Sequence, residues 1–215
     1  MRTKAEVVSA LLQPGVIAVI RAQKAEQVRP LTEALLAGGV KAIEITMTTP
    51  NAIEVIRRLA AECGSQALVG VGTVLDGQTA KAALDAGAEF VVSPAMRPAV
   101  AKEAQAAGRP VMLGAFTPTE AQAASEAGSD FIKIFPADAL GPAYIKAILA
   151  PLPHLRIIPT GIAKVEDVTA FVKAGCVAVG LGSLLVPQAA LREGNWGEIT
   201  RLARQFVDLV VKARQ

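Results

Sequence analysis

The sequence predicts a single (β/α)8 barrel that takes in residues 1–215 as one domain. The first sign is a repeat: short runs rich in β-branched residues begin at positions 16, 42, 67, 90, 110, 131, 156 and 177, which are 20 to 26 residues apart. Each interval has room for one strand, a turn, about three turns of helix and a return loop, but not for a second strand. The second sign is composition, because 52% of the residues are apolar and only 4% are aromatic, as in aliphatic parallel strands beneath Ala-rich helices. An open doubly wound sheet is the alternative, although no G-x-G-x-x-G motif follows the first run as in dinucleotide-binding sheets.

The expected elements follow one another in a regular order. The eight strands are expected in the segments VIAVIRA, AIEIT, ALVGVGT, FVVSP, PVMLGAF, FIKIFP, RIIPTG and VAVGLGS. The helices between them are expected to end at Ala-Gly pairs, where Gly can take the left-handed conformation that caps a helix. These pairs are Ala37-Gly38, Ala86-Gly87, Ala107-Gly108, Ala127-Gly128 and Ala174-Gly175. The first dozen residues and residues 195–214 are expected to form helices added at the two ends of the barrel.

Composition and charge exclude several classes of protein. A chain of 215 residues buries enough surface to hold a core without disulfides. Cys63 and Cys176 have no Cys or His neighbour at metal-ligand spacing, so we expect buried, reduced thiols and no zinc site. The mean hydropathy is +0.42, yet the apolar runs are too short to span a bilayer, and the first 15 residues lack an export signal. We therefore expect a cytoplasmic protein with no membrane partner, and the dispersed net charge of +3 argues against a nucleic-acid partner.

Two charged residues stand inside otherwise apolar strands. Lys133 lies in FIKIFP with Phe131 and Phe135 on its own face, and burial there favours the neutral amine that attacks a carbonyl carbon to form a Schiff base. Glu44 lies in AIEIT, on the face that it shares with Thr46. A structural ion pair is the alternative, but a buried pair often stabilises a fold no better than apolar residues do. An amine and a carboxylate in one lumen are the two groups that imine chemistry needs, so we favour a catalytic pair.

Small or polar residues follow several of the predicted strands, at the barrel face where enzymes of this fold place their sites. They are Thr73, Ser93, Pro94, Thr160, Gly161, Gly182 and Ser183. The glycines and the serine after the last two strands stand where backbone N–H groups commonly hold a phosphate, although tight turns would also explain the glycines. Arg21 ends the first strand, where it either pairs with an anionic group of a substrate or covers the barrel rim. With the exception of Ser93, we expect these residues to contact substrate, together with Thr46, Thr48, Phe135 and Ile162.

Other conspicuous residues are expected to take no part in chemistry. His154 is the only histidine and is expected in a surface loop, whereas Trp196 is expected to pack the last helix onto the barrel. No cluster of Asp, Glu or His points to a catalytic metal, and we expect no cofactor.

These residues, in this order, resemble the family of 2-keto-3-deoxy-6-phosphogluconate (KDPG)/4-hydroxy-2-oxoglutarate aldolases. The resemblance covers nearly the whole chain, from VIAVIRA to GSLLVP. Its strongest segments are AGGVKAIEITMTTP (37–50), GVGTVLD (70–76), VVSPA (91–95), TPTEAQAASEAG (117–128), FIKIFPADALGPAYIKA (131–147) and PTG (159–161). Because these motifs occur together, the resemblance is far more specific than any one of them alone.

The resemblance implies a metal-independent class I aldolase with a TIM-barrel fold, usually a homotrimer. Such an enzyme cleaves KDPG to pyruvate and glyceraldehyde 3-phosphate, so its partner is a small 2-oxo acid. Lys133 would be the Schiff-base lysine and Glu44 the general acid and base. The resemblance also assigns Thr73 to the pyruvate carboxylate, Pro94 and Phe135 to the pocket wall, and Gly161 and Ser183 to the phosphate.

The chain departs from the family pattern at two positions. Many members have an Arg four residues after the Glu, where it meets the substrate carboxylate; here that position is Thr48, and Arg21 is expected to carry the charge instead. The family usually has a second Gly after PTG, but here Ile162 follows Gly161. A β-branched residue does not readily take the positive φ that Gly allows, so phosphate binding is expected to be weakened, with Lys164 restoring part of the attraction. This predicts a preference for unphosphorylated 2-oxo acids, with cleavage of 4-hydroxy-2-oxoglutarate or decarboxylation of oxaloacetate through the same Schiff base.

Two further hypotheses belong to other functional classes. A phosphate-binding isomerase or synthase barrel would use Glu44 as a base and Lys133 only as an electrostatic clamp. A non-catalytic trimeric scaffold would leave both enclosed charges without a purpose, and it is the least favoured.

Overall fold

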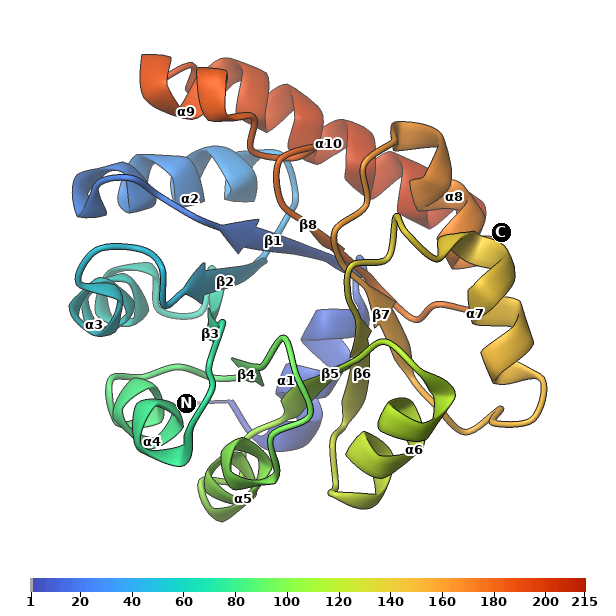
Figure 1. The fold of residues 1–215 in the computed structure, drawn as a ribbon. Coiled ribbons are helices and arrows are strands. Elements are labelled where there is room, and N and C mark those ends of the chain that lie inside the picture. The colour runs from blue at the N-terminus through green and yellow to red at the C-terminus, as the bar shows by residue number, and fades with distance from the viewer. Residues whose placement is uncertain (1) are drawn as a thin grey trace.

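The computed structural model describes residues 2–215, which form a ring of eight parallel strands surrounded by helices (Figure 1). The strands are β1 (Val16–Ile20), β2 (Ala42–Thr46), β3 (Leu68–Gly72), β4 (Val91–Val92), β5 (Val111–Ala115), β6 (Phe131–Ile134), β7 (Ile157–Pro159) and β8 (Val179–Leu181). They pair in the order β7-β6-β5-β4-β3-β2-β1-β8. A parallel bridge between Thr160 and Gly180, together with a hydrogen bond from Val177 N to Ile157 O, joins the two ends of this order. The predicted (β/α)8 barrel is confirmed, and the open sheet is excluded.

Helices cover the outside of the ring and one of its ends. They are α1 (Lys4–Leu12), the 3₁₀ helix η1 (Ala25–Gln27), α2 (Val28–Ala37), α3 (Ala52–Cys63), α4 (Gly77–Asp85), α5 (Pro98–Ala106), α6 (Pro118–Glu126), α7 (Gly141–Leu149), α8 (Val165–Lys173), α9 (Gln188–Glu193) and α10 (Trp196–Ala213). The added N-terminal helix is confirmed as α1. The prediction that residues 195–214 are also an added end helix is wrong, because α10 packs between α2 and α8 and contacts β1. It is the eighth helix of the barrel, since α9 is too short to cover the gap.

Four of the five predicted Ala-Gly helix ends have the expected backbone conformation. Their glycines, Gly87, Gly108, Gly128 and Gly175, all have positive φ. The first pair differs, because Gly38 has φ −88° and the left-handed residue is Gly39, with φ +91°. A Cβ on Gly38 would lie only 2.7 Å from Thr200 O and closer still to Ala203 Cβ. Gly38 therefore allows α2 to approach α10 closely, and Gly39 makes the turn.

The amino end of the barrel is closed by an apolar floor. Alternate strand residues point into the lumen, and the lowest of them form one buried cluster: Ile17, Ala42, Leu68, Phe90, Met112, Phe131, Ile158 and Ala178. Val7 and Leu11 of α1 belong to the same cluster, so α1 seals this end. The intervening strand residues pack outward against the helices. Only the carboxyl end of the barrel is left for a site.

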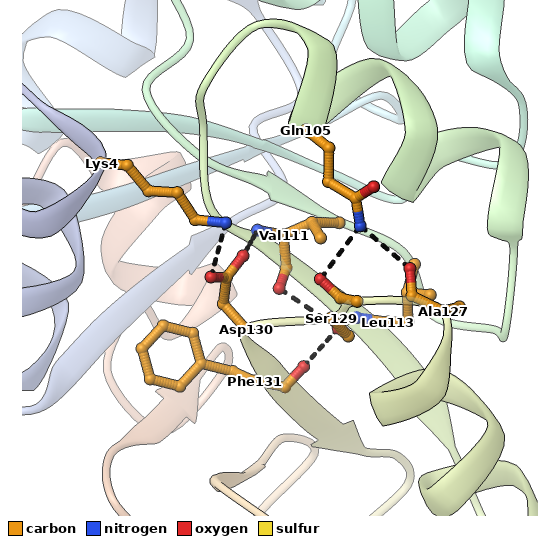
Figure 2. A network of polar contacts seen from close by, with 9 residues as sticks. Lys4, Gln105, Val111, Leu113, Ala127, Ser129, Asp130 and Phe131 are labelled. Carbon is orange, nitrogen blue, oxygen red and sulfur yellow. Dashed lines mark hydrogen bonds and ion pairs between the residues drawn. The ribbon is translucent and has the colours of Figure 1, made fainter.

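The strand that carries the buried lysine is fixed at its start by a polar network (Figure 2). Asp130 accepts a hydrogen bond from Val111 N at 2.9 Å, and its other carboxylate oxygen pairs with Lys4 Nζ of α1 at 2.8 Å. Ser129 Oγ donates to Phe131 O at 2.7 Å. These contacts connect α1, β5 and β6 below the lumen floor and hold the register in which β6 enters the barrel.

Candidate active site

Lys133 and Glu44 meet inside the barrel, one step above its apolar floor. Each stands two residues beyond a floor residue, Phe131 and Ala42 respectively, so each points into the lumen. Lys133 Nζ lies 3.8 Å from Glu44 Oε1, and the two side chains are only 5% and 3% exposed. The structure therefore brings together, inside the barrel, the two charged residues that stand out in the sequence.

The environment of this pair is mostly apolar. The ring centroid of Phe135 lies 5.6 Å from Lys133 Nζ, on the lumen face above it. Glu44 Oε1 is buried and has no hydrogen-bond partner among residues 2–215. A buried carboxylate oxygen without a donor is costly unless something else approaches it. The oxygen is therefore available to a water molecule or to a hydroxyl group of a bound substrate.

Glycines in the lumen make room for the loop beside the lysine. Gly114 is paired in register with Lys133 across β5 and β6. The backbone of Pro94 and Ala95 passes directly over Gly114, where a Cβ would clash with the Pro94 carbonyl group and with Ala95 N, 2.6 Å away. The loop after β4 therefore passes over the β5 residue that is paired with Lys133 only because residue 114 has no side chain. Pro94, which is expected in the pocket wall, is part of this close contact.

Hydroxyl groups line the mouth of the lumen near β2 and β3. Thr46 Oγ1 donates to Ile20 O at 2.9 Å and lies 2.7 Å from Thr48 Oγ1, so this pair is used to join β1 and β2. Thr73 follows β3 with φ +61°, a conformation that is strained for a β-branched residue and that recurs at functional sites. The left-handed turn therefore occurs at the residue that is expected to meet a carboxylate.

Arg21 follows β1, which is separated by β2 from β3, the strand that precedes Thr73. It is exposed, and none of the residues 2–215 forms a hydrogen bond or an ion pair with it. A Cβ on Gly182 would stand 3.1 Å from Arg21 Nη1, so the guanidinium group rests over the start of the loop after β8. Arg21 is thus a free cation at the rim of the lumen. Thr48, at the position where many family members have an Arg, is exposed and neutral.

The loops after β7 and β8 complete the mouth. Thr160 is buried, and Gly161 has φ +79° with the Phe135 ring 3.3 Å from its Cβ position. Leu185 N and Val186 N both donate to Gly182 O, at 3.0 and 2.8 Å, so Gly182 begins a tight turn that exposes Ser183.

Ile162 does not take the positive φ that a second glycine would allow after Gly161. Among the described non-glycine residues only Asn51 and Thr73 have positive φ, and the left-handed residue of this loop is Gly161. The Ile162 side chain is 6% exposed and packs in the aliphatic core between strands and helices. Ile162 therefore imposes no backbone strain on the loop, and its side chain points away from a ligand.

The remaining sequence predictions concern residues outside the site. Cys176 is buried, and this burial raises the pKa of its thiol to about 12; burial also raises the pKa of the half-buried Cys63. His154 is exposed, and Trp196 packs against the core.

In residues 2–215 no three His, Cys, Asp or Glu side chains come together as a metal site would require. The same residues contain no helix with both the length and the apolar character needed to cross a bilayer.

Comparison with known proteins shows the family. A model of the aldolase family described as KDPG and KHG aldolase matches residues 7–202. The chain belongs to this family. Aldolases are carbon–carbon lyases, so this family member is an enzyme of that class.

Three similar proteins illustrate the range of this aldolase family. The KHG/KDPG aldolase of Escherichia coli K12 is 36% identical over 96% of both chains. A probable 2-dehydro-3-deoxy-6-phosphogalactonate aldolase of Rhizobium meliloti is 37% identical over 81% of this chain and 82% of the relative. The crystal structure of KDPG aldolase from Legionella pneumophila, with pyruvate captured as a covalent carbinolamine intermediate, is 30% identical and superposes with a TM-score of 0.84 over 93% of this chain and 97% of that chain.

Proposed function

We propose that this family member is a class I aldolase that cleaves KDPG into pyruvate and glyceraldehyde 3-phosphate, with Lys133 as the Schiff-base residue and Glu44 as the general acid and base. The observation that carries the proposal is the buried pair itself, with Lys133 Nζ 3.8 Å from Glu44 Oε1 in the lumen. The names of the Escherichia coli and Legionella relatives support the substrate. The pyruvate carbinolamine captured in the Legionella enzyme supports the covalent mechanism.

The proposed reaction uses each group of the pair in turn. Lys133, as a neutral amine, attacks the C2 ketone, and the resulting carbinolamine loses water to give an iminium ion. Glu44 takes the proton of the C4 hydroxyl, the C3–C4 bond breaks, and its electron pair moves into the iminium to give an enamine and the aldehyde product. Glu44, directly or through a water, then returns a proton to C3. Addition of water to the iminium releases pyruvate and restores the amine.

The mouth residues are proposed to hold the two ends of this substrate. Thr73 meets the pyruvate carboxylate, Phe135 and Pro94 line the pocket, and Gly161 with Ser183 holds the phosphate. Thr46, Thr160 and Gly182 complete the contact surface, and Arg21 supplies the positive charge for an anionic group. Ile162 is proposed to support the Gly161 turn from the core rather than to touch the ligand.

Borohydride trapping tests the covalent step directly. Incubating the protein with pyruvate and borohydride reduces an imine to a stable secondary amine, so we expect the mass of one pyruvyl group on the peptide that contains Lys133. Mass spectrometry of digested protein checks the result, with borohydride alone as the control. An unmodified Lys133, under conditions that label an established class I aldolase, would exclude the proposed mechanism and favour the clamp hypothesis.

The same site could serve an unphosphorylated substrate, and one observation favours this second candidate. Arg21 is the free cation described at the rim, and Ser183 and Lys164 are exposed, so the charge available for a phosphate is modest. The alternative reactions are cleavage of 4-hydroxy-2-oxoglutarate and decarboxylation of oxaloacetate, and the galactonate epimer is a further phosphorylated substrate. Measuring kcat/KM side by side on all four compounds decides between them. A value for KDPG far above the others would reject the unphosphorylated candidates.

The assembly and compartment that we propose are a homotrimer in the cytoplasm, as the family resemblance implies. Leu75 and Phe116, which are 50% and 41% exposed, follow β3 and β5 on the site side of the barrel, where a neighbouring subunit would cover them. The two free cysteines fit a reducing compartment. Light scattering should give three times the 22.2 kDa chain mass, and a monomer mass at micromolar concentration would contradict this assembly.

A further inference from the structure

We propose that Gly72 is a positioning residue for Glu44: the space left by its missing side chain holds the Glu44 side chain, and this packing sets where the carboxylate stands beside Lys133. The inference rests on the proposed function, because it assigns a role in the proton-transfer steps of that mechanism.

The geometry places the two residues in contact across β2 and β3. In the register of these strands Glu44 is opposite Gly70 and Thr46 is opposite Gly72, so the Glu44 side chain leans toward the mouth and lies over Gly72. A Cβ on Gly72 would stand 2.5 Å from Glu44 Cδ, 2.7 Å from Cγ and closer still to Oε1. Three consecutive atoms of the side chain therefore occupy the place of one methyl group. An alanine at position 72 would require the whole side chain to rotate, rather than its tip alone to shift.

Little else holds the reactive oxygen in place. Oε1 has no hydrogen-bond partner among residues 2–215, and its 3.8 Å distance from Lys133 Nζ is longer than a hydrogen bond. A carboxylate that is oriented by donors would resist a small steric change, whereas one held by packing must move. The two lumen glycines of β3 differ in this respect, because a Cβ on Gly70 would meet the Phe90 ring of the floor instead.

The displacement should separate two steps of the reaction. Schiff-base formation requires the Lys133 amine and a place for the ketone, whereas exchange of the C3 protons of bound pyruvate requires a base at the correct position. In Gly72→Ala we expect borohydride trapping to stay within about twofold of the wild-type enzyme, while deuterium exchange at pyruvate C3, followed by NMR, falls by at least about tenfold. Gly197→Ala is the matched control, because its Cβ would have only Asn195 Oδ1 nearby, at 3.9 Å, and both rates should be unchanged.

A second set of variants links the effect to Glu44 itself. In a Glu44→Ala background the three atoms nearest to a Cβ on Gly72 are gone, so Gly72→Ala should cause little further loss of exchange. In the same background, any loss of melting temperature that Gly72→Ala causes in the wild-type protein should also disappear. This stability comparison decides the question even if the single variant folds poorly.

Three results would overturn the proposal. Gly72→Ala could leave exchange unchanged, it could reduce trapping and exchange equally, or it could cost the same stability with and without the Glu44 side chain. The proposed function fails in a different way, because the wild-type protein would then not be trapped by pyruvate and borohydride at all.

Discussion

Lys133→Arg is expected to lower kcat for KDPG cleavage by at least about 10⁴-fold and to abolish pyruvate trapping. Arginine keeps a positive charge beside Glu44, but its guanidinium group does not lose a proton in proteins and so cannot attack a ketone. The fold should persist, since the buried carboxylate keeps a cationic partner. Steady-state kinetics, borohydride trapping and thermal melting on the same preparation check the three statements together.

Two companion variants show why arginine is the informative replacement. Lys133→Ala removes the cation and leaves Glu44 buried without it, which typically costs roughly 3–5 kcal/mol of folding free energy, so its lost activity could reflect unfolding. Lys133→Met fills the space with an uncharged side chain, so it also leaves Glu44 buried without a cationic partner. If Lys133→Arg instead kept substantial activity, the lysine would be an electrostatic clamp, and the isomerase or synthase hypothesis would replace the aldolase mechanism.

The positions of the strands could be predicted because they depend on local pattern. Each apolar run is bounded by Gly, Pro or polar residues, and a period of two places Phe131, Lys133 and Phe135 on one face whatever the rest of the chain does. The buried pair Lys133 and Glu44 was predictable by the same reasoning, since a charge in such a run has few structural uses. Helix ends were predictable only in part: the Ala-Gly signal is local, but Gly38 is required by its contact with α10, which lies far away in the sequence.

The contacts across the lumen could not be predicted from the sequence. That Gly72 faces Glu44 depends on the stagger between β2 and β3, which is a property of the closed barrel. The same limit applies at Gly161 and Ile162, because the sequence indicates that a turn is present but not how the Ile162 side chain packs into the core. Thr73 is the opposite case: a β-branched residue gives no signal for a left-handed turn, so its conformation is visible only in the structure.

Glu44→Gln should leave Schiff-base formation intact while it slows the proton-transfer steps by about 10²- to 10⁴-fold. Glutamine has nearly the same shape and fits the same space over Gly72, so the position of the side chain is kept and only its ability to carry a proton is lost. The substitution leaves in place the Lys133 amine that attacks the ketone. Trapping by pyruvate and borohydride should therefore be as complete as in the wild-type enzyme, although C3 exchange and KDPG cleavage fall together.

This combination separates a base from a structural anion. If the Glu44 carboxylate served only to neutralise Lys133, Glu44→Gln would change trapping and melting temperature but would leave C3 exchange in proportion to the amount of imine formed. If it is the base, exchange per imine formed must fall, and Glu44→Asp should recover part of it because a displaced carboxylate still accepts protons. If C3 exchange in Glu44→Gln equals the wild-type rate, the base is a water molecule held at the mouth rather than Glu44. The buried carboxylate would then have no functional role in the barrel.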